Sequence, residues 1–226
     1  MKPEQSFGFM DRLDDAGERE TRLVALLKGA RTWLEETNPD RLYDSMLGAQ
    51  SRSRSFLAEG DRLDHIGFLL PPWAKEIVGK AATAAGFALG QRAFPSALVA
   101  RDLGRVVGKR RVETQIFKAH GRGRDESLIA FEAFLPSAAD ADVEDWIRRG
   151  VVQHVALEMT DPARFCAIRA SFVAEGIPMA QFMYGNAVYL PGEDATIAYF
   201  DLDGGEHPFR LEVRVRGEHT GEDLGL

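Results

Sequence analysis

The chain is poor in cysteine, with Cys166 as its one thiol among 226 residues. A single cysteine excludes an intramolecular disulfide and is typical of a reducing compartment. Cys166 falls on an apolar stripe of an expected helix, and this position predicts a buried structural thiol rather than a nucleophile.

Long apolar runs and an excess of positive charge are also missing. Without a signal peptide or a membrane-length apolar stretch, the sequence predicts a cytoplasmic protein. The net charge of −7 argues against nucleic acid or an anionic membrane as the main partner. The short basic run 109–111 is expected in a solvated hairpin loop.

The overall composition is typical of a globular protein, with 45% apolar and 28% charged residues. Residues 1–60 read as a helical N-terminal extension, with one helix at 18–37 and a second at 40–58. Two similar α+β units follow, at 61–136 and 151–217, joined by a helical connector at 137–149. The expected strands are listed in chain order: 63–70, 88–100, 112–120, 127–135, 151–159, 179–184, 186–191, 195–202 and 208–216.

A repeated pair of histidine and glutamate is the most informative pattern in the sequence. His65 and His154 each lie in a strand that precedes a helical stretch. Glu132 follows the first histidine by 67 residues, and Glu212 follows the second by 58 residues, each again in a strand.

Strand alternation groups these four residues on one kind of surface. In each strand the histidine or glutamate points to one face, while a bulky apolar row points to the other face. The apolar rows should be covered by helices. A lone polar residue on a strand is usually just solvated, but the fourfold coincidence favours a shared site. Two imidazoles and two carboxylates suit a divalent ion such as Zn, Ni, Mn or Fe, and the sequence does not decide among these.

This duplicated plan resembles the vicinal oxygen chelate superfamily, which includes glyoxalase I, bleomycin-resistance proteins and extradiol dioxygenases. The resemblance covers about residues 60–217. It implies two βαβββ modules whose mixed sheet curves around a metal cleft. By the same resemblance, the metal ligands would be His65, Glu132, His154 and Glu212. The site would form within one chain or across a homodimer.

The resemblance also implies a chemistry, with three alternatives left open. The first is a glyoxalase-like lyase or isomerase acting on a small substrate with vicinal oxygens, in which Glu132 or Glu212 is the catalytic base. The second is an Fe(II)-dependent dioxygenase acting on an aromatic ring or a 2-oxo acid, and the third is a protein that sequesters a ligand without chemistry. Four protein ligands favour the first alternative, and three favour the second.

Several further residues are candidates for the surroundings of the site. His120 ends a strand and could line the pocket. Charged residues on the same faces as the ligands are expected to form a structural ion pair at the rim, or else to recognise an acidic group of the substrate. They are Glu158, Arg210 and Arg214. Candidates of unresolved orientation are Gln115, Gln181 and Tyr184.

Overall fold

The computed structural model describes residues 19–38, 42, 61–71, 75–108, 111–137, 152–183, 195–202, 210–217 and 219–220. The helix expected at 40–58, the connector at 137–149, the strand at 186–191 and Tyr184 lie wholly or almost wholly outside these residues. The proposed division into 1–60, 61–136 and 151–217 therefore stays a prediction at its boundaries. Among the described helices, none is long and apolar enough to cross a membrane.

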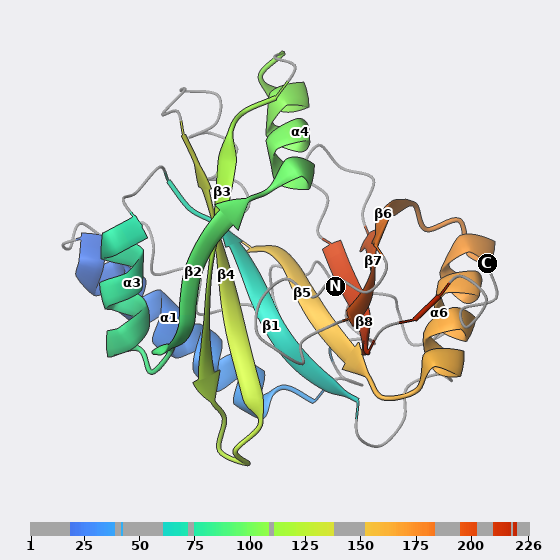
Figure 1. The fold of residues 1–226 in the computed structure, drawn as a ribbon, viewed down its shortest axis with the longest axis horizontal. Helices are drawn as coiled ribbons and strands as arrows, with labels where there is room; N and C mark the ends of the chain where they lie inside the picture. Colours follow the sequence, from blue (N-terminus) through green and yellow to red (C-terminus); the bar gives the residue numbers. More distant parts are fainter. Residues whose placement is uncertain are drawn as a thin grey trace.

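Within the described residues, eight strands form one mixed, curved sheet in the order β2-β3-β4-β1-β5-β8-β7-β6 (Figure 1). The first module contains β1 (Arg62–Leu69), β2 (Leu89–Pro95), β3 (Thr114–Arg122) and β4 (Leu128–Pro136). The second contains β5 (Val152–Met159), β6 (Met179–Met183), β7 (Ala195–Asp201) and β8 (Arg210–Arg216). This is the expected α+β plan of two βαβββ modules.

The two modules have the same internal pairing. In each, the first strand pairs in parallel with the last strand, and the other neighbours are antiparallel. The modules meet where β1 and β5 pair in antiparallel fashion at the centre of the sheet. The first strand of each module therefore carries its histidine to the middle of the molecule.

Helices cover the apolar rows of the sheet, as the alternation predicts. On the first module, α1 (Arg19–Glu36) and α3 (Lys75–Ala84) pack on Ile66, Phe68 and Phe131. On the second module, α6 (Pro162–Ala174) packs on Leu157 and Val213. The opposite, concave face is left for the polar side chains.

One element departs from the sequence-based expectation. Residues 88–100 were expected as one long strand, but β2 ends at Pro95 and α4 (Ala97–Val106) follows. The Ser96 hydroxyl accepts a hydrogen bond from the Val99 amide, which caps the helix. Val99 and Leu103 are one helical turn apart and pack on Leu69, Ile116 and Phe134. Helix α4 therefore lies on the concave face.

The expected ends of other elements need smaller corrections: β3 begins and ends two residues later than the expected strand at 112–120. Cys166 is half-buried rather than buried, and it packs against the second apolar core. Burial raises the pKa of its thiol, so the group is a poor nucleophile at neutral pH.

Candidate metal centre

His65 and His154 face each other at the junction of the two modules. Their Nε2 atoms are 2.9 Å apart, and both side chains are almost fully buried. His65 comes from β1 and His154 from β5, the two central strands. The histidines of the duplicated pattern thus meet in one chain.

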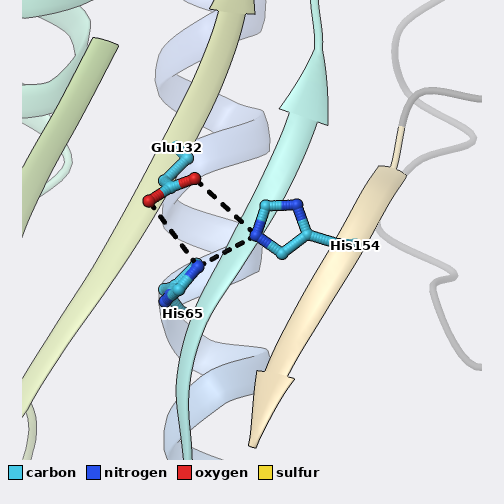
Figure 2. A group of neighbouring side chains, drawn as sticks. All are labelled: His65, Glu132 and His154. Atoms are coloured by element: carbon cyan, nitrogen blue, oxygen red, sulfur yellow. Dashed lines mark hydrogen bonds and ion pairs between the residues drawn. The ribbon is translucent and has the colours of Figure 1, made fainter. Parts of the chain in front are cut away.

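Glu132 and Glu212 enter the same space from the last strand of each module. Glu212 Oε2 lies 3.2 Å from His65 Nε2 and 3.4 Å from His154 Nε2. The two oxygens of Glu132 lie 3.7 Å from the same two nitrogens, one each. The four predicted residues therefore converge, and Figure 2 shows Glu132, His65 and His154 pointing at one another.

This arrangement fits a divalent metal ion. His65, Glu132 and His154 each offer one ligand atom, and these atoms all lie within 4.8 Å of one another. Two nitrogens bound at right angles, each about 2.1 Å from an ion, would be about 3.0 Å apart, close to the separation observed here. Glu212 Oε2 is buried beside the two imidazole nitrogens, where a bound cation would satisfy it.

A glycine makes room for this convergence. Gly67 lies opposite His154 on the neighbouring strand. A Cβ at Gly67 would stand 2.3 Å from two atoms of the His154 ring. Only a residue without a side chain lets the imidazole lie across β1 and reach the centre.

Asp64 is a residue that the sequence analysis did not single out. The pairing of β1 with β5 shifts between Leu63 and His65, which makes Asp64 the extra residue of a β-bulge. Leu63 accordingly joins the helix-covered core, which strict alternation from His65 would not allow. In the sequence, Asp64 could have been noticed as a charged residue next to a histidine within an expected strand.

The bulge lets Asp64 orient its neighbour. Asp64 Oδ2 is 2.7 Å from His65 Nδ1, so the ring donates from Nδ1 and presents Nε2 to the centre. Arg214 Nη1 donates to the same carboxylate at 2.6 Å. Burial alone would raise the pKa of Asp64, but the charge of Arg214, the hydrogen bond from His65 and the charge of His65 outweigh it. The pKa of Asp64 is therefore held well below its usual range.

Lys118 is the second residue that the sequence analysis missed. It lies in β3 directly opposite Glu132, is 1% exposed, and places Nζ 3.1 Å from Glu132 Oε1. Nothing in the surrounding sequence distinguishes it from an ordinary solvated strand lysine. Its burial follows only once β3 and β4 are paired.

The buried surroundings shift the pKa values of the two histidines in opposite directions. Burial alone would lower the pKa of His65, but Glu212, Glu132 and Asp64 outweigh it and raise the pKa to about 9. For His154, burial and the neighbouring His65 charge prevail over the two glutamates and lower the pKa to about 4. In the metal-free protein at pH 7, His65 is therefore charged and His154 is neutral.

Both glutamates are ionised at neutral pH. Burial would raise the pKa of Glu132, but Lys118 and the two histidines lower it overall. For Glu212, His65 is the main charge that overcomes burial, and the pKa falls far below the usual range. The donor set is therefore two imidazoles and two carboxylates, as expected.

The remaining candidates lie around this centre rather than in it. His120 is buried on the concave face, two strands from His65 with Ala130 between them. Gln181 is half-buried and pairs with Tyr199, whose ring stands 5.8 Å from that of His154. Gln115 is exposed, so it does not line a cavity, and its alternation with Lys118 places it on the other face.

The charged candidates are engaged in ion pairs. Arg214 lies 3.9 Å from Glu158, which also accepts from Arg62 and Arg216. Arg210 pairs with Asp201 in β7 and with Asp102 in α4, each at 2.6 Å. Ion pairs were expected here, but at a rim, whereas Glu158, Arg210 and Arg214 are buried. The pair of Arg210 with Asp102 ties α4 to the other module.

The structure therefore has the predicted plan. Its two βαβββ modules are joined through their first strands, and the four donors lie on the first and last strand of each module. This is the arrangement that the resemblance to the vicinal oxygen chelate superfamily implies. No protein-family model and no curated protein sequence matches this chain.

Solved structures with a similar fold are distant in sequence. A mutant of 4-hydroxymandelate synthase from Streptomyces coelicolor is 12% identical, with a TM-score of 0.46, over 71% of this chain and 50% of that one. The present chain thus spans about half the length of that enzyme. Methylmalonyl-CoA epimerase from Mycobacterium tuberculosis is 15% identical, with a TM-score of 0.39, over 69% of this chain and 87% of that one.

A hypothetical protein from Bacillus halodurans C-125 is 13% identical, with a TM-score of 0.39, over 72% of this chain and 99% of that one. Likenesses of this size identify neither a reaction nor a substrate. The chemistry of this chain has to be argued from its own residues.

Proposed function

We propose that the protein is a metal-dependent lyase or isomerase of the glyoxalase type, acting on a small substrate with two neighbouring oxygens. The observation that carries this proposal is the convergence of two imidazoles and two carboxylates from both modules on one buried point. His65, Glu132, His154 and Glu212 would hold the ion within one chain.

Each residue has a part in the proposed reaction. A bound divalent ion would supply Lewis-acid polarisation of a substrate oxygen. Asp64 keeps His65 in the tautomer that presents Nε2, and Gly67 gives His154 its place. Glu132 and Glu212 are ionised carboxylates in a water-poor site, and one of them accepts the proton from the carbon next to the polarised oxygen.

A second function, oxygen activation by Fe(II), is favoured by one observation. The subset His65, Glu132 and His154, whose ligand atoms lie within 4.8 Å of one another, is a set of two histidines and one carboxylate. The place of Glu212 near both imidazoles favours proton transfer instead, since it supplies a fourth protein ligand.

A substrate panel separates these functions. Hemithioacetals, 2-oxo acids and catechols are incubated with the protein loaded with Ni²⁺, Mn²⁺, Zn²⁺ or Fe²⁺, with product analysis and an oxygen electrode. The proposal expects turnover without oxygen uptake, abolished in Glu132→Gln or Glu212→Gln according to which carboxylate takes the proton. Oxygen uptake would establish the dioxygenase, and tight binding without turnover would establish ligand sequestration.

A further inference from the structure

Helix α4 covers one end of the concave face. It follows β2 and precedes β3, and it lies apart from α1, α3 and α6, the helices that cover the opposite face (Figure 1). Val99 and Leu103 of α4 pack in one apolar cluster with Phe134 of β4. The ring of Phe134 stands 5.6 Å from the ring of His154. The helix therefore rests on a side chain that borders a candidate metal ligand.

An ion pair fastens α4 to the second module. Asp102 Oδ2 in α4 lies 2.6 Å from Arg210 Nη1, and the two side chains are 14% and 5% exposed. Arg210 begins β8 and is the register partner of His154 in the pairing of β5 with β8. Because the strand order is β4-β1-β5-β8, α4 reaches from the first module across the strand of His154 to the second module.

The other charged contacts of these two residues stay within one element or one module. Arg210 Nε also lies 2.6 Å from Asp201 in β7. Asp102 also lies 3.2 Å from Arg101 and 3.9 Å from Arg105, which both belong to α4. Among the ion pairs of the described residues, the Asp102–Arg210 pair is thus the one that joins α4 to the second module.

The candidate metal centre is closed in this structure. None of its four donor side chains is more than 3% exposed, so an ion or a substrate reaches them only when a covering group moves. Helix α4 is held by a small apolar cluster that is separate from the two larger cores, and by the Asp102–Arg210 pair. Elements with few buried contacts are those that open most readily.

We propose that α4 is a lid over the metal centre and that the Asp102–Arg210 ion pair is its latch. When the pair breaks, α4 lifts from Phe134 and opens the centre at the end where His154 lies. When the pair forms, the lid closes over the bound ion and excludes water from it. The inference concerns access to the site, and it rests on the metal centre of the proposed function but not on the reaction.

The rate of metal loss tests the latch. The Zn²⁺-loaded protein is mixed with an excess of a chromogenic chelator, and the release of zinc is followed by absorbance. Asp102→Asn keeps the size of the side chain and removes its charge, so zinc loss should become roughly tenfold to a hundredfold faster. Asp102→Glu keeps the carboxylate and should stay closer to the wild type.

Asp201→Asn is the matched control. Asp201 contacts the same arginine at the same distance as Asp102 does, but it belongs to β7 and does not hold α4. This variant should release zinc at the rate of the wild type. Hydrogen exchange of the α4 amides, followed by mass spectrometry on the metal-free proteins, should be faster in Asp102→Asn and unchanged in Asp201→Asn.

Equilibrium measurements separate a lid from a contact that merely shapes the centre. A lid limits entry and exit alike, so Asp102→Asn should speed zinc uptake by a similar factor and leave the equilibrium zinc affinity unchanged. Wild-type rates in Asp102→Asn, equal acceleration in Asp201→Asn, or an affinity loss that accounts for the whole acceleration would overturn the inference. A wild type that binds no zinc would instead overturn the proposed function, and amide exchange in the metal-free variants would then decide on the latch by itself.

Discussion

At the scale of single residues, the site depends on groups that fix each ligand before any ion arrives. Asp64 fixes the ring of His65, Gly67 gives space to His154, and Lys118 accompanies Glu132. Such supporting groups commonly change metal affinity about tenfold to a hundredfold when they are replaced. They are therefore the most direct targets for substitution.

Gly67→Ala should damage the centre without touching a ligand. Because the new Cβ would stand 2.3 Å from the His154 ring, the imidazole must move. We expect metal affinity to fall by about tenfold to a hundredfold and stability to fall by about 1–3 kcal/mol, measured by metal titration and by urea unfolding. Gly79→Ala, in α3 and facing Gln91 and Phe117, is the control and should bind metal normally. Unchanged metal affinity in Gly67→Ala would refute the assigned position of His154.

His65 gives metal binding a pH dependence. With its pKa raised to about 9, the metal-free imidazole is charged at pH 7 and must lose a proton to bind an ion. Metal affinity should therefore rise between pH 7 and pH 9 and level off above it. Calorimetry at pH 7 in two buffers of different ionisation enthalpy should report about one proton released per ion. Release of no proton would contradict the charged state of His65.

The same shifts affect the stability of the metal-free protein. Because the pKa of His65 is raised from 6.5 to about 9, its contribution is complete below pH 6.5 and is lost as the pH rises through 9. Because the pKa of His154 is lowered to about 4, its neutral form contributes above pH 6.5, and this is lost as the pH falls toward 4. The melting temperature, measured in the presence of a chelator, should therefore show that the two histidines contribute most to stability near pH 6.5.

At the scale of elements, the two central strands and α4 define the concave face. Strands β1 and β5 were predictable because a histidine interrupts an otherwise apolar alternation in each. Helix α4 was not predicted, since Val99 and Ala100 were assigned to the preceding strand. Its start depends on the cap at Ser96, and its apolar stripe becomes clear only against Leu69 and Phe134.

The cap of α4 can be tested on its own. Ser96→Ala removes the acceptor for the Val99 amide and should lower the free energy of unfolding by about 1 kcal/mol. Ser96→Thr keeps an acceptor and should retain most of the stability, measured by urea unfolding of both variants. Equal stability of the wild type and Ser96→Ala would show that the cap contributes nothing to α4.

At the scale of the whole molecule, the sequence predicted the duplication but not the packing between its halves. The four ligand candidates, the module order and the helix-covered faces follow from alternation and spacing. The bulge at Asp64 and the burial of Lys118 could not be predicted, because both arise from pairing between strands that are distant in sequence. The residues that surround the centre are therefore the ones that required the structure.

The ion should stabilise the molecule as one unit, because its ligands come from both modules. At a free metal concentration about a hundred times the dissociation constant, the gain is about 2.7 kcal/mol, or roughly 5–10 °C in melting temperature for a chain of this size. Differential scanning calorimetry with and without chelator measures this shift. A melting temperature that is the same with and without chelator would argue against a bound ion.

Elemental analysis of four purified proteins tests the central claim most directly. These are the wild type, His65→Gln, His154→Gln and the matched control His120→Gln, which changes a buried histidine of the same face outside the cluster. After reconstitution with a divalent metal, the wild type and His120→Gln should hold about one ion per chain, and the other two variants should lose most of it. Unchanged metal content in both His65→Gln and His154→Gln, with circular dichroism showing intact folds, would contradict the account.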